Sequence, residues 1–149
     1  MIAEKDKEYM SLAINEAKKA YNEDEVPVGA IIVRNGEVIA SAYNTREYGK
    51  NALYHAEIKA IDQACKRLGG WRLVGCTMYV TLEPCPMCAG AIINARIERV
   101  VYGAPDNKAG AFGTMINLTD YPLYKPQIQN GVLEEECSKM LSDFFKSKR

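Results

Sequence analysis

One stretch of the chain, Cys76–Tyr102, places a strand, a helix and a second strand in direct succession. The β-rich run Cys76–Leu82 comes first, small apolar residues with helical character follow over Cys85–Ala95, and Arg99–Tyr102 is a short apolar strand. Two successive strands joined by a helix pair in parallel, with a right-handed crossover. This order predicts that part of the sheet is parallel and that helices cover it.

A hairpin is expected upstream of this unit. The runs Val26–Val33 and Glu37–Tyr43 both read as strands, and Asn35-Gly36 stands between them. An Asn-Gly pair favours a tight turn, because both of its positions need a positive φ. Before the hairpin, Lys5–Tyr21 has the apolar spacing of an amphipathic helix.

The remaining segments complete the predicted fold. We expect helices over His55–Leu68 and Val132–Phe145, a loop over Asn44–Tyr54, and a short edge strand over Pro126–Gln129. One hairpin and one βαβ unit, flanked by helices, predict a three-layer α/β/α sandwich with a central mixed sheet of about five strands. The length of 149 residues, without repeats or linkers, predicts a single domain over residues 1–149.

The composition excludes several classes of protein. Lys+Arg and Asp+Glu both number 19, so any attraction to a polyanion must come from a local patch. No apolar run approaches the ~20 residues of a membrane span, and Met1–Lys7 lacks the apolar core of a signal peptide. Five cysteines, an odd number without a secretory pattern, argue against a disulfide scaffold. We therefore expect a cytoplasmic protein with no membrane contact.

The one histidine of the chain stands in His55-Ala56-Glu57, well upstream of Pro84-Cys85-Pro86-Met87-Cys88. Imidazole nitrogen and thiolate sulfur are the ligands that zinc prefers, and a catalytic zinc keeps three protein ligands and one open position. Cys85 and Cys88 are three residues apart, so at a helix start both thiols face one side, where the helix dipole favours thiolates. Glu57, close to the histidine, can move protons without binding the metal.

These residues also admit other interpretations. A Cys-x-x-Cys pair alone also fits a redox pair or half of a structural zinc site. A structural site needs a fourth protein ligand, and the remaining cysteines lack the paired spacing of a zinc ribbon. A redox pair does not require His-x-Glu, so the pattern favours a catalytic zinc over Glu57 as a mere surface residue. We expect Cys65, Cys76 and Cys137 to be small buried residues, and Trp71 to be a packing plug rather than a base-stacking platform.

Short motifs that match one family recur over almost the whole chain, and they are Glu25–Ala30, Asn44, His55–Ile58, Tyr79–Cys85, Met87–Ala91, Val101–Ala104, Asp106–Ala111 and Leu141–Phe145. Together with the metal motif they resemble the bacterial tRNA-specific adenosine deaminases, within the cytidine/deoxycytidylate deaminase fold. The metal motif is typical of zinc-dependent nucleobase deaminases in general. The resemblance implies hydrolytic deamination of adenosine to inosine at the anticodon wobble position of tRNA, in a homodimer with one Zn²⁺ per subunit.

The resemblance also implies particular site residues. His55, Cys85 and Cys88 would bind zinc, whose hydroxide attacks the base while Glu57 shuttles protons. The implied substrate-binding residues are Val28, Asn44, Ala56, Leu82, Asp106 and Lys108. In the family, the asparagine and the alanine backbone read the flipped base, the valine and leucine line its pocket, and the last two residues contact neighbouring nucleotides. The alternative for Asp106 and Lys108 is a solvated loop that does not contact the substrate.

Three departures from the family pattern bear on the substrate. Asn51–Tyr54 replaces an Asp-Pro-Thr-Ala-like run, Asn94 stands where many members have histidine, and Tyr121–Pro126 lacks a frequent Asn-His pair. With the zero net charge, they favour an alternative, a deaminase of a free base or nucleotide of the guanine or cytosine type. The basic residues Lys146, Lys148 and Arg149 after the last helix favour RNA. A noncatalytic zinc-stabilised binding module is a third hypothesis.

Overall fold

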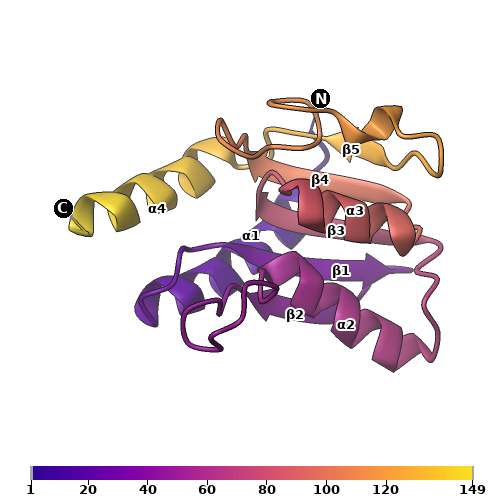
Figure 1. Ribbon diagram of the computed structural model, residues 1–149, viewed down its shortest axis with the longest axis horizontal. Helices are drawn as coiled ribbons and strands as arrows, with labels where there is room; N and C mark the ends of the chain where they lie inside the picture. Colours follow the sequence, from indigo (N-terminus) through magenta and orange to yellow (C-terminus); the bar gives the residue numbers. More distant parts are fainter. Residues whose placement is uncertain (1, 149) are drawn as a thin grey trace.

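A five-stranded mixed sheet forms the middle layer of the molecule, which the computed structural model describes over residues 2–148 (Figure 1). Its strands in chain order are β1 Gly29–Arg34, β2 Glu37–Tyr43, β3 Cys76–Leu82, β4 Arg99–Ala104 and β5 Gln127–Gln129. In space the order is β2-β1-β3-β4-β5. β1 pairs antiparallel with β2 and β3, whereas β3–β4 and β4–β5 are parallel. The predicted mixed sheet, hairpin, βαβ unit and short edge strand are thereby confirmed.

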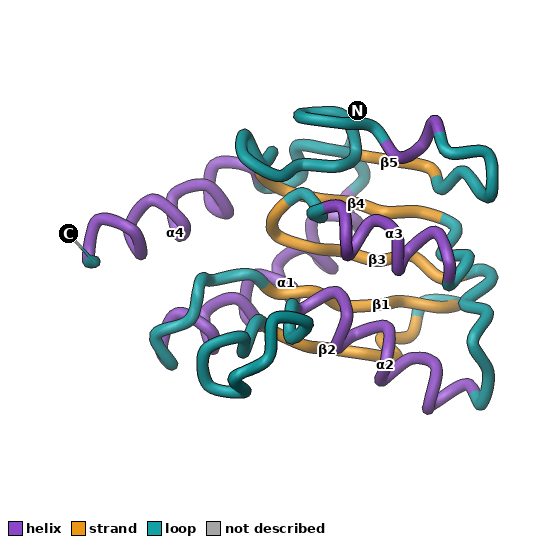
Figure 2. The backbone as a smooth tube through the Cα atoms, in the orientation of Figure 1, coloured by secondary structure: helices purple, strands orange, loops and turns teal. Residues whose placement is uncertain are grey.

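Helices cover both faces of this sheet. They are α1 Glu4–Asn22, α2 Ala56–Leu68, α3 Pro86–Asn94 and α4 Glu134–Ser147, with a short 3₁₀ helix, η1, at Leu118–Asp120. α2 and α3 pack on one face, and α1 and α4 lie on the other (Figures 1 and 2). Successive side chains of a strand point to opposite faces of the sheet. Ile32 of β1 accordingly packs in the apolar cluster on the side of α2 and α3, and Ile31 packs in the cluster on the side of α1 and α4. The three-layer sandwich is confirmed.

Three residues with positive φ form the hairpin turn and the end of α2. Asn35 and Gly36 both have positive φ, 51° and 75°, as the hairpin turn requires. Gly69 ends α2 in the left-handed region with a φ of 74°. Gly29 is required for a different reason: a Cβ there would lie 2.1 Å from the Ala13 carbonyl oxygen, so β1 touches the backbone of α1.

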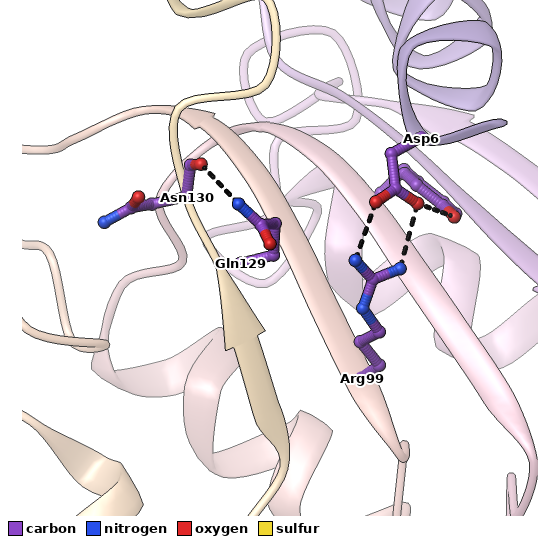
Figure 3. Close-up of polar contacts among 5 residues, drawn as sticks. Asp6, Arg99, Gln129 and Asn130 are labelled. Carbon is purple, nitrogen blue, oxygen red and sulfur yellow. Dashed lines mark hydrogen bonds and ion pairs between the residues drawn. The ribbon is translucent and has the colours of Figure 1, made fainter. Parts of the chain in front are cut away.

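A buried ion pair joins α1 to the sheet (Figure 3). The Asp6 carboxylate accepts two hydrogen bonds from the Arg99 guanidinium, at 2.9 and 2.7 Å, and one from the Tyr79 hydroxyl at 2.7 Å. Asp6 comes from α1, Tyr79 from β3 and Arg99 from the start of β4. The contact therefore ties three elements together, on the sheet face opposite α2 and α3.

Some expectations about single residues were wrong. Trp71 is 53% exposed and is no packing plug; the guanidinium of Arg72 lies 4.4 Å from its ring centroid and that of Arg96 lies 5.6 Å away. Cys76 and Cys137 are buried as predicted, but Cys65 is only half-buried. Of the basic tail, Arg149 lies outside the described residues. None of the helices between residues 2 and 148 combines the length and apolar character that crossing a bilayer requires.

Candidate metal centre and active site

Two helix starts bring three metal-ligating side chains together. His55 immediately precedes α2 and Cys85 immediately precedes α3, so both lie at positive helix ends, and Cys88 follows in the first turn of α3. The Nδ1 atom of His55 lies 3.7 Å from Cys85 Sγ and 3.5 Å from Cys88 Sγ. All three ligand atoms lie within 4.8 Å of one another. The structure thus gathers the three predicted ligands from segments that are far apart in sequence.

This donor set fits zinc. Tetrahedral bonds of about 2.3 Å to sulfur and about 2.0 Å to nitrogen put those two atoms about 3.5 Å apart, close to the separations found here. Within residues 2–148 the cluster contains no fourth histidine, cysteine or carboxylate ligand. A site with two sulfurs, one nitrogen and an open fourth position has the composition of a catalytic rather than a structural zinc site.

The thiols of Cys85 and Cys88 differ in their pKa. Hydrogen bonds from Cys88 and then from His55 lower the pKa of Cys85 to about 4, and the bond to Cys85 raises the pKa of Cys88. The hydrogen bond with Cys85 also raises the pKa of His55. The lowered pKa favours the thiolate form of Cys85, and the charge of a bound metal ion would favour the thiolate form of both cysteines.

Glu57 lies in the first turn of α2, beside the metal cluster but outside it. Its side chain is 4% exposed, and burial raises the pKa of its carboxyl to about 7. It lines the same pocket as His55 and Cys85. A carboxyl group in that position can exchange protons with a ligand in the pocket while the metal keeps its three protein ligands.

A pocket of about 120 Å³ opens above the cluster. Its lining residues are Val26, Val28, Asn44, Arg46, His55, Ala56, Glu57, Leu82, Glu83, Cys85 and Asp106. This volume holds several water molecules or one small planar ring. A base belonging to a nucleic acid must therefore leave its stack to enter the pocket.

Five of the six predicted substrate-binding residues lie in this lining: Val28, Asn44, Ala56, Leu82 and Asp106. The sixth, Lys108, is exposed on the neighbouring loop and does not line the pocket. The Asp106 carboxylate turns back onto its own loop, where it accepts hydrogen bonds from the backbone N–H of Lys108 and Ala109.

Asn44 is held in a fixed orientation. Its side-chain amide donates to the Val26 carbonyl at 3.1 Å, and its Oδ1 accepts from the backbone N–H of Arg46 at 3.1 Å. A side-chain amide carries two N–H donors and two acceptor lone pairs, so one of each remains for a ligand. The buried Asn44 can therefore recognise a group that both accepts and donates hydrogen bonds.

Three residues that line the pocket, Val26, Arg46 and Glu83, were not predicted from the sequence. Val26 and Glu83 stand inside motifs that were noted for the family resemblance, and Arg46 lies two residues after Asn44. Their proximity to residues already singled out was the available signal. Which of them faces the pocket depended on loop conformation, which local sequence patterns do not specify.

The fold and the three-ligand cluster define the class of zinc-binding deaminases. The family model of the cytidine and deoxycytidylate deaminase zinc-binding region matches residues 3–104.

Relatives within this class narrow the assignment. A tRNA-specific adenosine deaminase of Bacillus subtilis (strain 168) is 55% identical over 146 residues, which cover 97% of this chain and 91% of the relative. That of Aquifex aeolicus (strain VF5) is 46% identical over 145 residues, 96% of each chain. A structure solved in work on A-to-I editing by tRNA:A34 deaminases at the wobble position of transfer RNA matches with a TM-score of 0.87 and 43% identity, over 90% of this chain and 99% of that one. The chain belongs to the tRNA-specific adenosine deaminases.

Proposed function

We propose that this chain converts the wobble adenosine of a tRNA anticodon to inosine by hydrolytic deamination. The observation that carries the proposal is the open cluster of His55, Cys85 and Cys88 beside the buried Glu57, at the base of a pocket that admits a single base. The family to which the chain belongs supports adenosine in tRNA as the substrate.

His55, Cys85 and Cys88 would hold one zinc ion per subunit. When bound, zinc lowers the pKa of a water and so supplies the nucleophile of the reaction. Glu57 would accept a proton from a water molecule in the pocket and pass it to a ring nitrogen. It would then take the proton of the added hydroxyl group and deliver it to the leaving amine. Water adds at the carbon that carries the amine, the carbon–nitrogen bond breaks, and ammonia leaves.

The pocket walls hold the flipped base in place. Asn44 offers its remaining donor and acceptor to the base, the backbone of Ala56 reads its edge, and Val28 and Leu82 pack against its ring. Asp106 and Lys108 contact the nucleotides beside the target. Burial of the base among apolar side chains excludes bulk water and holds the reacting carbon near Glu57.

The remaining features of the proposal concern assembly and location. Residues 1–149 form a single domain that acts as a homodimer. A tRNA substrate, together with five cysteines that are all free, supports the cytoplasm as its compartment.

The test is inosine formation on an unmodified anticodon stem-loop with a wobble adenosine, run beside free adenine, guanine, cytosine and their nucleosides. We expect inosine in the stem-loop and no turnover of the free compounds. Turnover of a free base with an untouched stem-loop would contradict the RNA substrate and support the free-base alternative. A protein that binds zinc but turns over none of these compounds would support the noncatalytic module.

A further inference from the structure

A buried carboxylate without a cationic partner lies at one wall of the pocket. The side chain of Glu83 is 1% exposed and forms no ion pair with any residue between 2 and 148. It accepts hydrogen bonds from the backbone N–H of Asp106 at 3.1 Å, Phe112 at 3.0 Å and Thr114 at 3.2 Å, and from the Thr114 hydroxyl. Burying a charge is costly unless hydrogen bonds compensate it, so the loop over residues 105–114 is folded around this carboxylate.

The loop touches Glu83 so closely that one position must be glycine. A Cβ on Gly110 would lie 2.5 Å from the Glu83 carboxyl group and 2.6 Å from the Asp106 carbonyl oxygen. The loop also returns to the segment after Glu83, because the backbone N–H of Ala111 donates to the Pro84 carbonyl at 2.9 Å. Glu83 therefore determines where Asp106 stands in the pocket wall.

A second buried carboxylate, that of Glu25, holds another loop that lines the pocket. Glu25 is 1% exposed and accepts hydrogen bonds from the backbone N–H of Glu47 at 3.0 Å and Tyr48 at 2.7 Å. These two residues belong to the loop that follows β2, which brings Asn44 and Arg46 to the pocket. Both walls are thus loops without regular structure, and each is held by one buried glutamate from a segment next to a strand, Glu25 before β1 and Glu83 after β3.

We propose that Glu25 and Glu83 are positioning residues that set the spacing of the two loops and thereby the affinity for the substrate. The inference rests on the function proposed above. The oxygens of both carboxylates accept hydrogen bonds from backbone N–H groups of the two loops, and proton transfer is assigned to Glu57, so neither Glu25 nor Glu83 is given a part in the chemical step. They act through the backbone of the loops, which carry the groups that touch the RNA.

The test is the steady-state deamination of the stem-loop by Glu83→Gln. Oε1 accepts from the Asp106 N–H and the Thr114 hydroxyl, and Oε2 accepts from the N–H groups of Phe112 and Thr114. The amide of glutamine therefore places its NH₂ group against at least one backbone N–H in either orientation. We expect KM to rise by at least about tenfold, because bonds to a charged acceptor are lost. We expect kcat to stay within about threefold and the zinc content to be that of the wild type. Glu25→Gln shifts KM in the same direction.

Two sets of controls separate positioning from general stability. Thr114→Ala removes one donor to Glu83 from an exposed residue, and Thr114→Ser restores it; KM rises in the first and returns in the second. This pair also decides the matter if Glu83→Gln does not fold. Asp6→Asn loses a buried ion pair on the opposite face of the sheet, so it lowers the melting temperature and leaves KM unchanged.

The outcomes distinguish the inference from the function on which it rests. An unchanged KM in Glu83→Gln and Thr114→Ala would overturn the positioning role, as would a loss of zinc and kcat at constant KM. If the wild type deaminates only a free base, the RNA function is wrong, and the same KM shift measured with that base still supports positioning.

Discussion

The contact between Asp6 and Arg99 allows a stability change to be worked out from the structure. In Asp6→Asn the amide NH₂ replaces an oxygen that accepts the 2.7 Å bond from Arg99, so one charged hydrogen bond is lost and a donor faces a donor. Breaking a buried pair costs about 3–5 kcal/mol. The Arg99 side chain is 28% exposed and water can solvate it again, so we expect a loss of about 2–3 kcal/mol. For a chain of this length, the melting temperature falls by about 5–10 °C.

The pH dependence of this loss has a definite sign. The hydrogen bond from Arg99 lowers the pKa of Asp6 below its ordinary value of 3.8. A group whose pKa is lower in the folded protein stabilises it above the unfolded pKa, and this contribution disappears as the pH falls through the folded pKa. The asparagine side chain does not titrate. The difference in the free energy of unfolding between wild type and variant is therefore complete at neutral pH and shrinks below pH 3.8.

The assay is urea unfolding of both proteins at neutral pH and at a pH below 3.8, where the carboxylate of Asp6 in the unfolded chain becomes protonated. Equal unfolding free energies at neutral pH would refute the proposed energetic role of the pair. A difference that grows toward acid would refute the assigned direction of the pKa shift. Deamination below the melting temperature should match the wild type, because the pair lies on the face opposite α2 and α3.

Further predictions concern the metal, the proton shuttle and the packing of α1. Glu57→Gln should keep zinc and fold but lose turnover by about 10²–10⁴-fold, because the proton transfer is gone; a near wild-type rate would refute that role. Cys88→Ala should lose zinc, measured by metal analysis, together with stability, since metal binding is coupled to folding; Cys137→Ala, which removes a buried thiol elsewhere, should keep the metal. Gly29→Ala should lower the free energy of unfolding in urea by about 3 kcal/mol or more, because its Cβ would lie 2.1 and 2.5 Å from backbone atoms of α1. In the control, Gly70→Ala, the Cβ meets no atom within 4 Å, so the free energy of unfolding should change little.

The local features of the fold could be read from the sequence. The strands Glu37–Tyr43 and Cys76–Leu82 were predicted with the bounds that the structure shows, because β-rich runs and the Asn35-Gly36 turn act within a few residues. The parallel pairing of β3 and β4 followed from the helix between them. His55, Cys85 and Cys88 were predicted as zinc ligands by residue type and spacing, and the structure brings their ligand atoms within 4.8 Å of one another.

Other features were decided by tertiary structure alone. Asp6 and Arg99 are 93 residues apart, and Glu83 accepts hydrogen bonds from a loop 23 to 31 residues away. No local sequence pattern predicts either contact. The exposure of Trp71, whose ring lies beside the guanidinium groups of Arg72 and Arg96, was likewise not predicted from the sequence. Residue type and period determine which elements form and which atoms can bind a metal. The partner of a buried charge is determined only when distant segments meet, because that charge must be compensated by whatever donors the fold brings to it.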